Sequence, residues 1–224
     1  MNKIFLLGAF ILMLVMASFV RDKKKKVIFF GDSITQAGVQ PKGYITVLQN
    51  MLAQQGINGY ELQGAGIGGN KIYDLYLRMD SDVIAKQPDI VVVFVGVNDV
   101  WHKRTYGTGT DAEKFEKFYH ALIHKLQLNN AKVVICTPAS IGEKTDFSNE
   151  QDGDLNKYCN LIRKIAADEN VPLVDLRKFL LEYNIANNPK NLEKGILTAD
   201  GVHLNDKGNQ LVAEQMWNVL KEVK

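Results

Sequence analysis

The chain has 224 residues, of which 46% are hydrophobic and 23% charged, so it can bury one sizeable core and lacks the composition of a disordered protein. The formal net charge is +2, but residues 1–26 hold six of the Lys and Arg residues and one Asp, which leaves the rest at −3. That balance excludes the basic surface of a nucleic-acid-binding protein, and two cysteines are too few for a disulfide framework.

Residues 1–20, "MNKIFLLGAFILMLVMASFV", have the features of a secretory signal peptide. A lysine at position 3 precedes a long apolar run, which ends in the small residues Ala17 and Ser18. The alternative is a retained membrane anchor, because the run is close to the length that spans a bilayer. The cations that follow at positions 21–26 lie on the wrong side for such an anchor. We expect cleavage and export to the periplasm or the medium, with no other membrane contact.

After this segment, short β-rich runs alternate with longer stretches of helical periodicity. The expected strands are at 26–31, 60–65, 89–96, 131–138 and 171–176. The expected helices are at 43–55, 71–86, 111–128, 151–169 and 206–222, with a shorter one after Asp175. Apolar runs such as "IVVVFV" indicate strands buried on both faces. The sequence therefore predicts one α/β domain over residues 27–224, a three-layer α/β/α sandwich with a mostly parallel five-stranded sheet.

A serine stands where the first strand ends, in "GDSIT" at 31–35. Open parallel sheets bind their ligands beyond the carboxyl ends of the strands, so Ser33 is a candidate nucleophile. Serine is also a common helix N-cap, and position alone leaves both interpretations open.

Complementary groups follow later in the chain. In "TADGVHLN", Asp200 and His203 are three residues apart, so a tight turn would let the carboxylate orient an imidazole that acts as base. Candidate donors for an oxyanion are the amide of Gly66 in "LQGAGIGG", the side chain of Asn98 in "VFVGVNDV", and the amide of Ser33.

Together these four stretches resemble the blocks of the SGNH hydrolase superfamily, the GDSL-type esterases and lipases, in the family's order. "GDSIT" is similar to the first block, "GAGIGG" to the second, "GVND" to the third and "DGVH" to the last. The resemblance implies a serine esterase with Ser33, His203 and Asp200 as its triad. It implies an oxyanion hole of Ser33, Gly66 and Asn98, and no metal or organic cofactor.

Two other patterns point elsewhere. Gly64, Gly66 and Gly69 fit the dinucleotide-binding pattern G-x-G-x-x-G, but they follow the second strand instead of the first. His120 and His124, in "HALIH", are one helical turn apart, as in helical zinc sites. They lie away from the helix face that carries Phe115 and Phe118, and we interpret them as part of a solvated surface.

The substrate is expected to be a small-molecule or carbohydrate ester. The loop expected at 99–110, "DVWHKRTYGTGT", would place Trp101 and Tyr106 at the pocket, and we add Asp32 as a candidate contact. Aromatic rings with polar tips suit a sugar face, so the hypothesis is removal of acetyl groups from carbohydrates. The alternatives are a lysophospholipase or thioesterase and, from another class, a binding module without activity.

Overall fold

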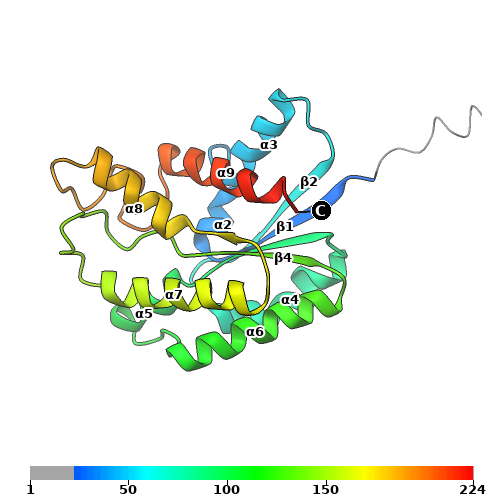
Figure 1. Cartoon of the computed structure of the whole chain (residues 1–224), viewed down its shortest axis with the longest axis horizontal. Coiled ribbons are helices and arrows are strands. Elements are labelled where there is room, and N and C mark those ends of the chain that lie inside the picture. The colour runs from blue at the N-terminus through cyan, green and yellow to red at the C-terminus, as the bar shows by residue number, and fades with distance from the viewer. Residues whose placement is uncertain (1–22, 224) are drawn as a thin grey trace, which may run out of the picture.

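The computed structural model describes residues 23–223, so the predicted signal peptide at 1–20 lies outside the described residues. Five parallel strands form one sheet in the order β2-β1-β3-β4-β5 (Figure 1). The strands are β1 (Lys25–Gly31), β2 (Tyr60–Gly66), β3 (Ile90–Phe94), β4 (Lys132–Cys136) and β5 (Leu173–Val174). The prediction of a three-layer sandwich on a parallel sheet is confirmed.

Helices cover both faces of this sheet (Figure 1). On one face lie α3 (Tyr44–Gln54), α8 (Leu176–Asn187) and α9 (Asp206–Leu220), and on the other α4 (Ile72–Asp82), α6 (Ala112–Leu128) and α7 (Asp152–Asp168). The short helices are α2 (Ser33–Gly38), α5 (Val97–Thr105) and the 3-10 turn η1 (Ile84–Lys86).

Alternation along β1 divides the core into two clusters. Val27 and Phe29 pack into the cluster that includes residues of α3, α8 and α9, whereas Ile28 and Phe30 pack into the one that includes α4, α6 and α7. All four side chains have no exposed surface. Since successive strand residues point to opposite faces, burial on both sides explains the uninterrupted apolar run that the sequence shows here.

The segment predicted as a loop at 99–110 begins instead with a helix, and that prediction was wrong. Gly96 has φ +125, a conformation that favours glycine, and α5 starts directly after it. Val97 and Val100 are buried, and Trp101 packs against the core. The polar composition of the segment hid the helix, which is stabilised by burial of this one side.

The register brings the strand ends to one edge of the sheet. Gly31 at the end of β1 is paired with Gly66 on one side and Phe94 on the other, and Phe94 is paired with Cys136. The segments that follow these four strands therefore leave the sheet side by side. None of the helices between residues 23 and 223 is both long and apolar enough to cross a membrane.

Candidate active site

Ser33 is the first residue of α2, immediately beyond β1. The cap of this helix is Asp32, whose Oδ1 accepts a hydrogen bond of 3.0 Å from the Ile34 amide. The Ser33 hydroxyl is therefore not used for capping, which excludes the N-cap interpretation of this serine. Its Oγ lies 2.9 Å from Nε2 of His203.

His203 and Asp200 come from the connection between α8 and α9. Asp200 Oδ2 lies 2.7 Å from Nδ1 of His203, and Asp200 Oδ1 accepts from the amides of His203 and Val202 at 2.8 and 3.0 Å. Burial alone would raise the pKa of Asp200, but the hydrogen bonds from the His203 ring and these amides outweigh it and hold the pKa below its ordinary value. The ionised carboxylate favours the tautomer with the proton on Nδ1, which leaves Nε2 to accept from Ser33.

The proposed oxyanion donors differ in where the structure places them relative to Ser33. Asn98 is 1% exposed, and its Nδ2 donates to the carbonyl of Asn70 at 3.1 Å, which leaves the second N–H of that amide group available. Gly66 backs onto α2, where a Cβ would lie 2.1 Å from the Gln36 nitrogen. The loop glycine that faces Ser33 is Gly68, at which a Cβ would lie 3.9 Å from Ser33 Cβ. The structure thus assigns Gly66 a packing role that the motif alone did not indicate.

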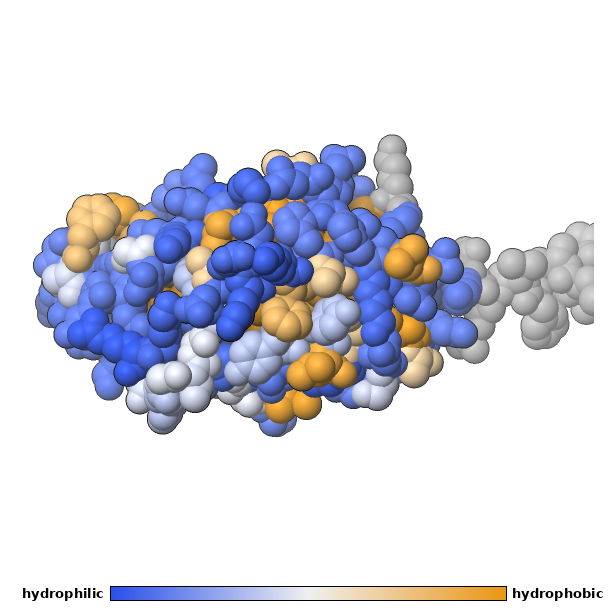
Figure 2. Space-filling view, turned by 90° about the horizontal axis from the view of Figure 1, so that it is seen from below, coloured by the Kyte–Doolittle hydropathy of each residue, from blue (hydrophilic) through white to orange (hydrophobic). Residues whose placement is uncertain are grey.

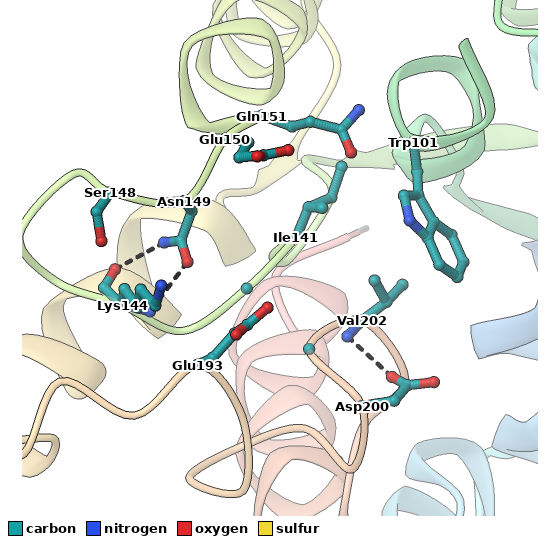
Figure 3. Close-up of a pocket in the computed structure, with 12 residues that line it drawn as sticks. Trp101, Ile141, Lys144, Ser148, Asn149, Glu150, Gln151, Glu193, Asp200 and Val202 are labelled. Carbon is teal, nitrogen blue, oxygen red and sulfur yellow. Dashed lines mark hydrogen bonds between the residues drawn. The ribbon is translucent and has the colours of Figure 1, made fainter. Parts of the chain in front are cut away.

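A pocket of about 440 Å³ opens beside Asp200 (Figure 3). Trp101 stands at one side of it, and its indole ring meets the His203 ring edge to face, with centroids 6.2 Å apart. Across the pocket, most side chains are polar or charged, and they come from the β4–α7 connection and from the segment before Asp200: Lys144, Ser148, Asn149, Glu150, Gln151 and Glu193.

The other two residues expected to contact substrate lie elsewhere. Asp32 is 1% exposed and points into the protein, so the structure gives it no access to a substrate. Tyr106 is 66% exposed and packs edge to face on His102, outside the lining of the pocket. Because α5 replaces the expected loop, its last turn carries Tyr106 away from the pocket.

Comparison with known proteins agrees with this geometry. Residues 29–211 match the GDSL-like Lipase/Acylhydrolase family. The chain belongs to this family. The crystal structure of an acetyl xylan esterase is 67% identical, with a TM-score of 0.85, over 86% of this chain and 98% of that one. An acetylxylan esterase of Geobacillus stearothermophilus is 28% identical over 84% of this chain and 90% of its own. A multidomain esterase of Ruminococcus flavefaciens is 27% identical over 82% of this chain and 27% of its own.

This GDSL-like protein is a carboxylic ester hydrolase, which confirms the enzyme class predicted from the four blocks. The alternative hypothesis, a binding module without activity, is thereby excluded. Residues 29–211, which match the family, contain all four sequence blocks and extend beyond β5. The similarity therefore covers the edge of the sheet on which Ser33, Asn98 and His203 lie.

The sequence did not point to Glu143, which holds the histidine segment of this hydrolase in place. This carboxylate is 1% exposed and accepts the amides of Ile196, Leu197 and Thr198 at 2.7, 2.6 and 2.7 Å. It therefore fixes the backbone that leads into Asp200. Nothing in "SIGEKT" marks Glu143, because its partners lie more than fifty residues further along the chain.

Two buried carboxyl groups lie beneath the site of the hydrolase. Burial, together with the charge of the neighbouring Asp99, raises the pKa of Asp32 to about 7 in spite of the hydrogen bond from the Ile34 amide. Burial also raises the pKa of Asp99 to about 7, although the Ile72 amide donates to both its oxygens. Neither group contacts the pocket, and both keep their protons well above the pH at which an exposed aspartate loses them.

These carboxyl groups make folding dependent on pH. Between its ordinary pKa of 3.8 and about 7, Asp32 is protonated in the folded protein and ionised in the unfolded chain. The folded state then binds more protons, so stability falls as the pH rises, by about 1.4 kcal/mol per pH unit for this group. We expect Asp32→Asn to remove this contribution to the pH dependence of the free energy of unfolding. Urea unfolding at about pH 4.5 to 6.5, inside the range between the two pKa values, measures it.

The matched control is Glu182→Gln, which removes an exposed carboxylate of α8. We expect its free energy of unfolding to follow the wild-type pH dependence. A wild-type slope in Asp32→Asn would mean that Asp32 ionises in the folded protein as it does in the unfolded chain.

Proposed function

We propose that this hydrolase cleaves acetyl esters by acyl transfer through Ser33. His203 Nε2 takes the proton of the Ser33 hydroxyl, and Oγ attacks the carbonyl carbon of the ester. The tetrahedral intermediate collapses as His203 returns the proton to the leaving alkoxide, and the acetyl group stays on Ser33. Water, deprotonated by the same histidine, then releases acetate. The 2.9 Å contact between Ser33 and His203 carries this proposal.

The developing negative charge needs donors that are already in place. We assign this role to the amide of Ser33, to the free N–H of Asn98 and to an amide of the glycine-rich segment 66–69. Asn98 is held by its bond to the carbonyl of Asn70, the residue that directly follows that segment, so one contact fixes both parts of the oxyanion hole relative to each other.

The substrate proposed is an acetylated carbohydrate of the xylan type. The polar lining of the pocket beside Asp200 supports it, because a sugar presents hydroxyl groups whereas an acyl tail requires apolar walls. Trp101 offers one aromatic surface to a sugar ring. The names of the 67% and 28% identical relatives, both acetylxylan esterases, point to the same substrate class. An exported enzyme would meet this polymer, which fits the signal peptide expected at residues 1–20.

The test compares esters that differ in only one part. We expect kcat/KM to fall at least about tenfold from 4-nitrophenyl acetate to the octanoate, since the pocket offers little apolar surface for the longer chain. We expect Trp101→Ala to lower kcat/KM on acetylated xylo-oligosaccharides by about tenfold or more, and on 4-nitrophenyl acetate by less, because only the sugar reaches the wall that the indole forms.

Ile141→Ala is the control for Trp101→Ala. It also removes a hydrophobic side chain from the pocket lining, but one that offers no aromatic face to a sugar. If lysophospholipids or long-chain thioesters are hydrolysed faster than acetylated oligosaccharides, a lipid acyl hydrolase replaces the carbohydrate esterase. Equal losses on both acetate substrates in Trp101→Ala would assign the indole to support of His203 instead of sugar binding.

A further inference from the structure

A cluster of three metal-binding side chains lies between α6 and α7, outside the proposed active site. His120 and His124 are one turn apart on α6, and Glu169 follows the last residue of α7. Glu169 Oε1 contacts Nδ1 of His120, and Glu169 Oε2 lies 2.9 Å from Nε2 of His124. The interpretation of this histidine pair as a solvated surface is therefore incomplete, because α7 packs beside α6 and leaves the His120 side chain only 27% exposed.

The geometry of the cluster suits a small tetrahedral ion. One ligand atom from each residue lies within 4.8 Å of the other two. Around Zn²⁺, ligand atoms at about 2.0–2.2 Å from the metal lie about 3.3–3.6 Å apart, so small side-chain rotations close the site. The His124 side chain is 59% exposed and free to make that rotation. Two histidines and one carboxylate leave the fourth position to water.

The three side chains of the cluster are carried by backbone that is held in helices α6 and α7 or directly at the end of α7. The Glu169 amide donates to the Ile165 carbonyl at 2.9 Å and ends α7, and the Glu169 side chain is only 12% exposed. The two histidines lie in the body of a 17-residue helix. The carboxylate is thus held over the histidine pair before any ion arrives, which reduces the entropy lost on binding.

The surrounding charge favours a cation. Lys164 is paired with Glu116 at 2.8 Å and with Asp168 at 3.1 Å. Asp168 directly precedes Glu169, so the two carboxylates that pair with this one ammonium group leave a net negative charge next to the cluster. Figure 2 looks at the molecule from the side on which α6 lies, and the surface there is mainly hydrophilic, so an aqueous ion can reach it.

We propose that His120, His124 and Glu169 bind Zn²⁺ and that the ion ties α6 to α7. Glu169 precedes the start of β5, whereas Ser33 follows the end of β1, so the two sites lie at opposite edges of the parallel sheet. The ion is a brace between two helices of one layer and takes no part in ester hydrolysis. Imidazole ligands favour Zn²⁺ over Ca²⁺ and Mg²⁺, which prefer oxygen.

The test titrates ZnCl₂ into the untagged, chelator-treated protein by calorimetry and follows the thermal midpoint. We expect one Zn²⁺ per chain, and a midpoint raised by about 5–10 °C at roughly a hundredfold excess over Kd, while Ca²⁺ and Mg²⁺ leave it unchanged. We expect His124→Ala, at an exposed position, and Glu169→Gln each to weaken binding at least about tenfold.

Asp168→Asn is the matched control, since it removes the adjacent carboxylate that pairs with Lys164 and keeps all three ligands. We expect it to bind one Zn²⁺ with an affinity within about threefold of wild type. Absence of Zn²⁺ binding by the wild type, or unchanged affinity in His124→Ala and Glu169→Gln, would overturn the site. Because His124→Ala leaves the packed side of α6 intact, its melting curve without metal distinguishes loss of a ligand from loss of the fold.

Discussion

Replacement of Ser33 by alanine is expected to lower kcat for 4-nitrophenyl acetate by at least about 10⁴-fold, because the acyl group then has no nucleophile to receive it. The thermal midpoint should stay close to that of wild type. Asp32, not Ser33, caps α2, and among the described residues the lost hydroxyl makes a hydrogen bond only with His203. Initial rates and circular dichroism melting curves measure the two effects separately.

Ser81→Ala is the control for this substitution. Ser81 is an exposed serine on α4 whose hydroxyl lies 2.9 Å from Asp82 Oδ1 and 3.2 Å from the Arg78 carbonyl, so its loss removes a similar group that makes no bond to His203. We expect wild-type rates from this variant. Hydrolysis by Ser33→Ala at more than a tenth of the wild-type rate, a threshold of about 1.4 kcal/mol in activation free energy, would mean that another group attacks the ester.

The second large effect is expected from Glu143→Ala. The substitution leaves the amides of Ile196, Leu197 and Thr198 without their acceptor, and Leu197 and Thr198 are buried. A buried unpaired donor costs about 1–3 kcal/mol, so we expect the free energy of unfolding to fall by about 3 kcal/mol or more. We also expect a lower kcat at temperatures at which the variant is still fully folded, because the freed segment leads directly into Asp200.

Glu143→Gln tests the reason for this loss. Its Oε1 can still accept from Leu197 and Thr198, but its NH₂ group would face the Ile196 amide, donor against donor. We expect partial recovery of both stability and kcat. Glu182→Ala removes an exposed glutamate of α8 and should change neither. Full activity in a destabilised Glu143→Ala would limit Glu143 to a structural role.

The sequence predicted the layers of the fold because buried parallel strands are apolar without interruption and the helices between them are amphipathic. It also singled out Ser33 as a candidate, since chemistry in such a sheet is concentrated just beyond the strand ends. Asp200 and His203 were candidates because of their spacing and their resemblance to the last block, and all three stay predictions. It did not predict α5, whose residues are polar apart from one buried side. There the tertiary packing of Val97 and Val100 overrides local composition.

Sequence patterns did not reveal contacts between residues that are far apart in the chain. Glu143 and its three amides lie more than fifty residues apart, and Glu169 is 45 residues from His124. A motif search within one helix finds the histidine pair but not the carboxylate that α7 brings to it. Asp32 belongs to a recognisable block, yet its burial, and hence its raised pKa, depends on neighbours such as Asp99.

The activation of Ser33 by His203 can be tested most directly with an alkyl fluorophosphonate, from which an activated serine displaces fluoride to form a stable ester at phosphorus. We expect one phosphonyl group per chain, found by peptide mass spectrometry on Ser33, with activity lost in proportion to labelling. Ser33→Ala and His203→Ala should remain unlabelled under the same conditions. Inactivation with the label on another residue, or full activity in protein labelled at Ser33, would contradict the proposed mechanism.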